Sequence, residues 1–232
     1  MKWVTVSDNT LHVQERRSTD AGGRSDSRTP SFRDAITPAA VHELVFDPRG
    51  LGSPPMFPAL VAARAAIDAN DKAKALIWID PAGSLYPPAV MAGPVPIGEF
   101  DLVRPTTDDD TTWATVECLR CKQVAVVVSL IMHKLSRVEV RRLQLAAESG
   151  GAAAILMRPN LKSAAIDVYA AATRWHVSPA PGERTIQRWK IKQIHGHGRS
   201  DFLLEKNRAT GQIDFVHPPA AMARDPLLAQ TS

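Results

Sequence analysis

The feature that most constrains the fold is a set of short apolar runs that alternate with longer segments of helical character. The runs have strand length and cover Val41–Phe46, Ala75–Ile79, Val124–Val128 and Ala153–Met157. Helical segments separate them, from about Met56 to Asn70, from Asp110 to Lys122 and from Ser136 to Ser149. A strand that is apolar throughout has both faces covered, and regular alternation with helices is typical of a parallel sheet. The pattern therefore predicts an α/β domain with a mostly parallel sheet flanked by helices.

The first of these runs leads into a turn-forming segment and then a helix, which is the order of a nucleotide-binding βαβ unit. This segment, Asp47–Pro55, contains Gly50, Gly52 and Ser53. A phosphate-binding loop needs glycines whose backbone amides hold the phosphates, a Lys that reaches the outer phosphates, and a hydroxyl for Mg²⁺. No Lys stands here, and Pro54 and Pro55 have no N–H to donate. An ordinary turn is the favoured interpretation, and a weak anion site at the start of the following helix is the alternative.

Two further positions of a nucleotide hydrolase lack the expected carboxylates. Hydrolysis needs one acid that activates water and another, at a strand end, that helps to hold Mg²⁺. Asp80 follows Ala75–Ile79 with no Glu near it, and Ser129 follows Val124–Val128. Asp80 alone is interpreted as a strand-end or turn residue. We therefore interpret Gly50, Gly52, Ser53 and Asp80 as a degenerate nucleotide site, and predict no catalysis, no cofactor and no metal. A weak, atypical ATPase is a further alternative.

A family resemblance rests on segments spread over about residues 41 to 205. They are Val41–Leu44, Ala75–Asp80 followed by Leu85–Pro88, Leu102–Arg104, Trp113–Arg120, Arg141–Glu148, and Thr173–Trp175 leading to Pro179–Pro181. In these segments and their order the chain resembles ImuA, a RecA-like accessory protein of the bacterial SOS mutasome. It is more distantly similar to the SulA cell-division inhibitors.

The resemblance implies a RecA-like fold and a non-catalytic partner of an ImuB-type inactive polymerase homologue and a DnaE-type error-prone polymerase. The process that it implies is damage-induced translesion synthesis. A SulA-like regulator that binds the division machinery is the alternative.

Composition and cysteine content indicate an intracellular protein. With 232 residues and 44% hydrophobic side chains, the chain can form one sizeable core. No apolar run approaches the roughly 18 residues of a membrane span, and the apolar patch within Met1–Asp8 is too short for a secretory signal. We therefore expect a cytoplasmic protein with no membrane partner. Cys118 and Cys121 are too few for a structural zinc site, and we interpret them as small buried side chains.

The chain is predicted to divide into three regions. Residues 1–38, rich in Ser, Thr, Asp, Arg and Gly, are expected to be disordered or loosely attached. Residues 39–216 form the RecA-like domain, which ends in an antiparallel hairpin of Arg188–Ile194 and Asp201–Glu205. Residues 217–232 are expected to be a flexible tail.

Charge distribution is more informative than the net charge of +4. Two basic groups stand out: Arg137, Arg141 and Arg142 on one helix, and Arg184, Arg188, Lys190, Lys192 and Arg199 in and around the hairpin. In Arg188–Lys192 the charges alternate with apolar residues, so one strand face is basic and the other is buried. This face is either a solvated edge or a contact surface for DNA phosphates or an acidic partner. Asp108–Asp110 is interpreted as the acidic first turn of a helix, with a metal site as the minor alternative.

Overall fold

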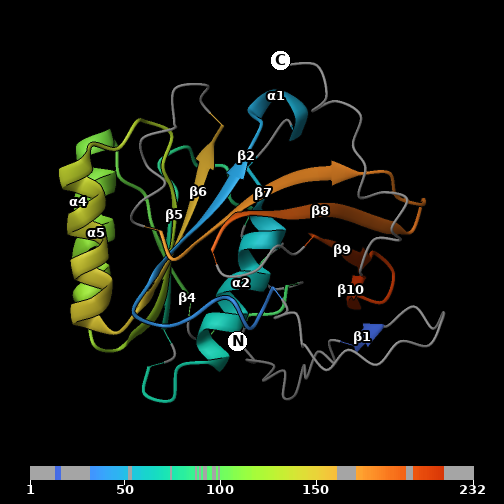
Figure 1. Ribbon diagram of the computed structural model, residues 1–232, viewed down its shortest axis with the longest axis horizontal. Helices are drawn as coiled ribbons and strands as arrows, with labels where there is room; N and C mark the ends of the chain where they lie inside the picture. The colour runs from blue at the N-terminus through green and yellow to red at the C-terminus, as the bar shows by residue number, and fades with distance from the viewer. Residues whose placement is uncertain are drawn as a thin grey trace, which may run out of the picture.

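The computed structural model describes residues 14–16, 32–51, 54–73, 75–86, 88, 90, 93–95, 98, 100–160, 171–196 and 201–216. They form one ten-stranded sheet with helices on both faces (Figure 1), in the order β1-β10-β9-β8-β7-β2-β6-β5-β3-β4. The strands from β7 to β4 in this order are mutually parallel, and β8, β9 and β10 extend the sheet by antiparallel pairing. The predicted fold class, a mostly parallel sheet with a carboxy-terminal antiparallel extension, is confirmed.

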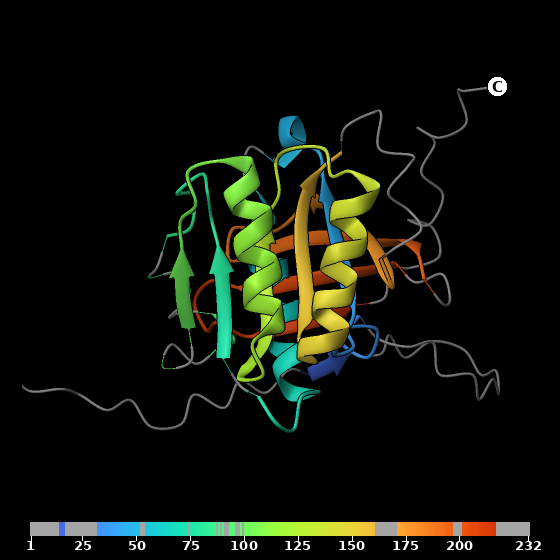
Figure 2. The same cartoon turned by 90° about the vertical axis from the view of Figure 1, so that its left-hand side faces the viewer.

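The parallel part of the sheet consists of β2 (Val41–Phe46), β3 (Ala75–Ile79), β4 (Phe100–Val103), β5 (Val124–Leu130), β6 (Ala153–Pro159) and β7 (Thr173–Ala180). Every residue of β2, β5 and β6 is buried, because helices cover both faces at the centre of the sheet. One face carries α2 (Met56–Asp68), and the other carries α4 (Asp108–Arg120) and α5 (Arg137–Gly150). Figure 2 shows α4 and α5 side by side in front of the sheet, with α2 behind it. A short helix, α1 (Pro48–Leu51), follows β2.

Local sequence signals set the ends of α4 and α5. Ser136 and Glu139 form a capping box at the start of α5, and Gly151 ends that helix in the left-handed conformation at φ 79°. The Thr107 side chain caps α4 by accepting a hydrogen bond from the Asp110 amide, and Asp108–Asp110 form an acidic first turn.

The carboxy-terminal ends of α4 and α5 lie in direct backbone contact. A Cβ atom added to Gly150 of α5 would lie 1.7 Å from the carbonyl oxygen of Leu119 in α4. Only a residue without a side chain fits at this crossing.

The antiparallel extension consists of β8 (Ile186–His195), β9 (Asp201–Asn207) and β10 (Ile213–Val216), with β1 (Gln14–Arg16) beside β10. Alternate side chains of β8, Trp189 and Ile191, join the core that includes α2. Phe32 and Ile36 belong to the same core at 0% and 1% exposure. The packed domain therefore begins before residue 39, where the sequence pattern placed its start. Within the described residues, no helix is long and apolar enough to cross a bilayer.

Candidate functional site

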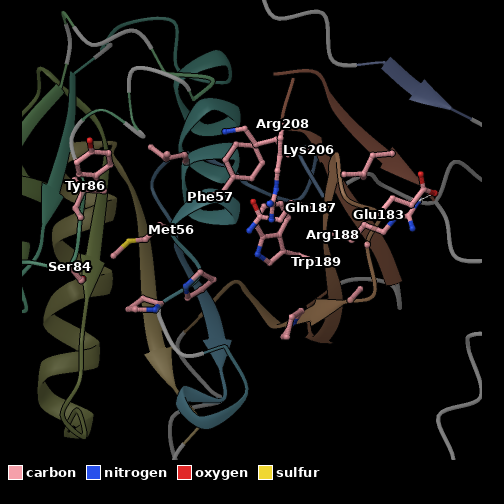
Figure 3. A pocket seen from close by; sticks show the side chains of 18 residues that line it. Met56, Phe57, Ser84, Tyr86, Glu183, Gln187, Arg188, Trp189, Lys206 and Arg208 are labelled. Atoms are coloured by element: carbon pink, nitrogen blue, oxygen red, sulfur yellow. Dashed lines mark ion pairs between the residues drawn. The ribbon is translucent and has the colours of Figure 1, made fainter. Parts of the chain in front are cut away.

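An open groove of about 530 Å³ lies where the antiparallel extension meets the amino-terminal end of α2 (Figure 3). Met56 and Phe57 come from the first turn of α2, Tyr86 comes from the loop after β3, and the opposite side carries Trp189 of β8 and Lys206 of β9. Among the described residues that line the groove, three are cationic and one is anionic: Arg188, Lys206 and Arg208 against Glu183. The groove therefore carries an excess of positive charge.

Phe57 contacts both an aromatic ring and a cation. Trp189 stacks on it with ring centroids 5.0 Å apart and planes at 23°, and the Lys206 Nζ lies 4.4 Å from its centroid. Burial lowers the pKa of Lys206 because the charged ammonium loses hydration there. The stack thus holds a partly desolvated cation in the groove.

The start of α2 offers few donors to an anion. The Met56 amide donates to the Pro54 carbonyl at 2.8 Å, and Pro55 and Pro58 have no amide hydrogen. At most the Phe57 amide is left to bind a phosphate at this helix end. Of the predicted degenerate site, Gly50 lies in α1, while Gly52 and Ser53 lie outside the described residues.

Asp80 and Ser129, at the ends of β3 and β5, are both fully buried and engaged in hydrogen bonds. The Asp80 carboxylate accepts from the Ser84 hydroxyl at 3.0 Å and from the Leu85 amide at 2.7 Å. The Ser129 and Thr115 hydroxyl oxygens are 2.9 Å apart. These groups serve local structure. Within the described part of the chain, no cluster of His, Cys, Asp and Glu side chains is suited to hold a metal ion.

The predicted basic face of the hairpin exists, but acidic side chains border it. Arg188, Lys190 and Lys192 are all half-buried on the face of β8 opposite Trp189. Arg188 pairs with Glu205 of β9 at 2.5 Å, and Lys192 lies opposite Asp201 of the same strand. Of these three cations, only Arg188 lines the groove. Arg184 is exposed before β8, and Arg199 lies outside the described residues.

The three arginines predicted on α5, Arg137, Arg141 and Arg142, are exposed. Three apolar side chains on the same helical layer also face solvent: Trp113 of α4 is 59% exposed, and Val138 and Leu145 of α5 are 69% and 46% exposed. The outer surface of α4 and α5 is therefore apolar in part, and it also carries exposed arginines and exposed acidic side chains. We call it the α4–α5 face.

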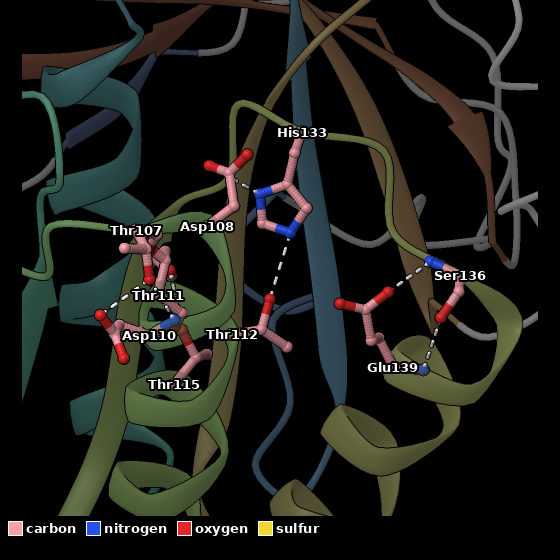
Figure 4. Close-up of polar contacts among 10 residues, drawn as sticks. Thr107, Asp108, Asp110, Thr111, Thr112, Thr115, His133, Ser136 and Glu139 are labelled. Carbon is pink, nitrogen blue, oxygen red and sulfur yellow. Dashed lines mark hydrogen bonds and ion pairs between the residues drawn. The ribbon is translucent and has the colours of Figure 1, made fainter.

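A histidine links the first turn of α4 to the loop after β5 (Figure 4). His133 Nδ1 lies 3.3 Å from Asp108 Oδ1, and His133 Nε2 lies 3.1 Å from Thr112 Oγ1. An acid, a histidine and a hydroxyl in this order resemble the groups of a nucleophilic catalyst. Thr112 is only 4% exposed, so a substrate does not reach its hydroxyl, and the contacts serve to fasten the loop to the helix.

A buried charge cluster lies in the centre of the sheet. Glu43 of β2 is 2.9 Å from Arg158 Nη1 of β6 and 2.6 Å from Arg174 Nε of β7. All three residues are at least nine-tenths buried. The Arg174 Nε and Glu43 Oε2 atoms are close without the alignment of a hydrogen bond, so their attraction is mainly Coulombic.

The cysteines differ from the expectation. Cys118 is half-buried, whereas Cys121 is exposed. Burial raises the pKa of the Cys118 thiol, and the nearby Cys121 and Glu117 raise it further. The expectation that both are buried is wrong for Cys121. A raised pKa leaves less of the reactive thiolate.

Known proteins similar to this chain are found among solved structures. No family model and no curated protein matches the chain. Among solved structures, the chain is similar to the crystal structure of SulA from Pseudomonas aeruginosa, at 24% sequence identity and a TM-score of 0.45. The match covers 53% of this chain and 100% of the SulA chain. The resemblance to ImuA stays a prediction from the sequence.

Sequence reasoning predicted Arg188 of the groove and the three arginines of the α4–α5 face, but it missed the other groove residues and the apolar residues of that face. The groove residues come from separate parts of the chain, and the sheet topology brings them together: Phe57, Tyr86, and the pair Lys206 and Arg208. A signal did exist for the second surface, because Val138, Arg141 and Leu145 recur at the spacing of one helix face.

Proposed function

We propose that this chain is a non-catalytic accessory protein of a DNA-damage-induced translesion synthesis complex, and that it binds a protein partner through the α4–α5 face. The observation that carries the proposal is the exposure of Trp113, Val138 and Leu145 on one helical layer. Large apolar side chains gathered on one surface mark a site of interaction with another protein.

The chemistry of this face indicates the kind of partner segment that fits. Val138, Arg141 and Leu145 stand at i, i+3 and i+7 of α5, so they form a stripe along the helix. Trp113 adds an aromatic anchor from the adjacent α4. Trp and Arg are the side chains that most often dominate binding energy in interfaces. An amphipathic helix with an apolar stripe and an acidic side chain opposite Arg141 complements this part of the surface.

A second line of support comes from the strand ends where a nucleotide hydrolase keeps its catalytic groups. The Asp80 carboxylate and the Ser129 hydroxyl are used in buried hydrogen bonds, and prolines flank the start of α2, where a phosphate-binding helix needs free amides. A protein that has the layered sheet but no free catalytic groups at these strand ends is suited to binding other proteins in a complex. The partners we propose, an ImuB-type polymerase homologue and a DnaE-type polymerase, follow from the sequence resemblance.

Isothermal titration of the purified chain with an ImuB-type protein tests the proposal. Trp113→Ala and Leu145→Asp should each weaken binding by about tenfold or more, as expected for anchors at the centre of an interface. Tyr86→Ala is the matched control, because Tyr86 is an exposed aromatic residue in the groove on the α2 side of the sheet. Circular-dichroism melts of all three variants should match the parent chain, since these side chains are exposed.

Equal affinity of the parent chain, Trp113→Ala and Leu145→Asp would remove the α4–α5 face from the interface. Absence of binding between the parent chain and the polymerase homologue would refute the partner. A parallel titration with ATP and Mg²⁺ should show no binding at micromolar concentrations. A micromolar affinity for ATP would contradict the non-catalytic role.

A further inference from the structure

We propose that Cys118 and Cys121 form a reversible redox site, at which a low-molecular-weight disulfide such as glutathione disulfide oxidises the two thiols to an intramolecular disulfide. They are the two cysteines of the chain, and both are free thiols at the end of α4. The modification needs no partner protein. Its test is therefore independent of the test of the proposed function.

The backbone holds the two cysteines at a separation that a disulfide can span. Cys118 is in the last turn of α4, and the Cys121 amide closes that turn by donating to the Cys118 carbonyl at 3.2 Å. Residues i and i+3 of such a turn have Cα atoms about 5–6 Å apart. A disulfide needs about 4.4–6.8 Å between the same atoms. The bond therefore forms without unwinding the helix.

The two side chains also leave the backbone on the same side of the helix. Cys121 still has a helical φ of −72°, and the chain departs from the helix only at its ψ of 122°, so its Cβ stays beside that of Cys118. Cβ atoms of such a pair are about 5–6 Å apart, whereas a disulfide needs about 3.5–4.5 Å. The last turn must tighten by roughly 1 Å, which a helix end permits.

Different exposure gives the two thiols different roles. Cys121 is exposed, so its Sγ is the atom that an oxidant in solution reaches first. Its weak hydrogen bond to the Gln123 amide oxygen, at 3.4 Å, is easily exchanged for water. Cys118 is half-buried, and burial, followed by the charge of a Cys121 thiolate, raises the pKa of its thiol. We therefore assign Cys121 as the attacking thiol and Cys118 as the resolving thiol.

The oxidation proceeds by two successive thiol–disulfide exchanges. The Cys121 thiolate attacks one sulfur of the oxidant, the S–S bond of the oxidant breaks, and one thiolate leaves. The Cys118 thiol then loses its proton and attacks the Cys121 Sγ, and the second thiolate leaves. The protein gives up two electrons and two protons, and the oxidant is reduced to two thiols. An excess of thiol reverses both steps, because exposed disulfides are the labile ones.

The site lies where α4 meets α5. Leu119 stands between the two cysteines, and its carbonyl oxygen is the atom that approaches Gly150 most closely. Trp113 precedes Cys121 by eight residues, which is about 12 Å along the helix. A disulfide that tightens this turn thus acts at the crossing of the two helices and at one end of the α4–α5 face. An effect on partner binding rests on the proposed function, whereas formation of the disulfide does not.

Incubation of the full chain with glutathione disulfide, followed by thiol titration and intact-mass spectrometry, tests the proposal. The parent chain should lose both free thiols and the mass of two hydrogen atoms, and it should remain a monomer on a non-reducing gel. An excess of reduced glutathione should restore both thiols. These readouts need no variant, so they decide the proposal even where a substitution affects folding.

Two matched variants test the order of attack. Cys118→Ser should retain a glutathione adduct on Cys121, because no second thiol releases it. Cys121→Ser should react more slowly, because its remaining thiol is half-buried. In urea the two variants should react at the same rate, since unfolding removes the difference in exposure.

Three results would overturn the assignment. A parent chain that retains a glutathione adduct, as Cys118→Ser does, would show that Cys118 does not reach Cys121. A disulfide-linked dimer would place the bond between two chains. Equal reaction rates of the folded Cys118→Ser and Cys121→Ser variants would remove the assigned order of attack.

Discussion

Replacing Glu43 with Gln is expected to destabilise the fold more than its conservative shape suggests. The substitution keeps the size of the side chain and removes the negative charge that contacts both Arg158 and Arg174. Their side chains are only 5% and 9% exposed, so water cannot replace the lost carboxylate. Breaking a buried ion pair by removing one partner typically costs about 3–5 kcal/mol. A loss of this size is a large fraction of the stability of an ordinary domain, about 5–15 kcal/mol.

A matched variant separates the charge effect from the effect of altered packing. Glu43→Leu combined with Arg158→Met and Arg174→Met removes all three charges while keeping apolar volume, and such replacements are often neutral or stabilising. We therefore expect the triple variant to recover most of the stability that Glu43→Gln loses. Urea denaturation followed by far-ultraviolet circular dichroism gives both free energies of unfolding. If Glu43→Gln unfolds within about 1 kcal/mol of the parent, the charge cluster does not have the proposed energetic role.

Two further predictions concern buried polar groups. Asp80→Ala should lower the free energy of unfolding by about 2–3 kcal/mol, because the Leu85 amide and the Ser84 hydroxyl lose their acceptor. Asp80→Asn keeps one acceptor oxygen and should lose less stability. A thermal melt of Asp80→Ala equal to that of the parent chain would show that these hydrogen bonds are not needed. Burial lowers the pKa of His42 below its ordinary value of 6.5, so the unfolded chain takes up a proton more readily than the folded one. Stability should therefore be full above about pH 6.5 and should fall as the pH drops below this value. Denaturation midpoints of the parent and His42→Asn across this range check the effect, and an equally steep fall in both proteins would show that another group is responsible.

The strands and helices of the core could be predicted because their signals are local. β2 and β3 have the predicted bounds, and β5 and β6 extend each predicted run by two residues. These runs are apolar over a strand length, and the signal does not depend on the partners of each strand. The start of α5 has an equally local signal in the Ser136 and Glu139 capping box.

The groove could not be predicted, because no local pattern encodes it. Tyr86 follows β3 while Lys206 lies in β9, and the two meet because β7 returns beside β2 and starts the antiparallel extension. The surroundings of the basic hairpin could not be predicted either. Alternation placed Arg188, Lys190 and Lys192 on one face, but their acidic neighbours Glu205 and Asp201 depend on the register of β9.

The contact between Gly150 and Leu119 has a consequence for how the α4–α5 face can vary. Because main chain meets main chain at this crossing, the distance between the two helices is set there without any intervening side chain. Substitutions elsewhere on the outer surface can therefore alter its charge and apolarity while the spacing of the helices stays fixed.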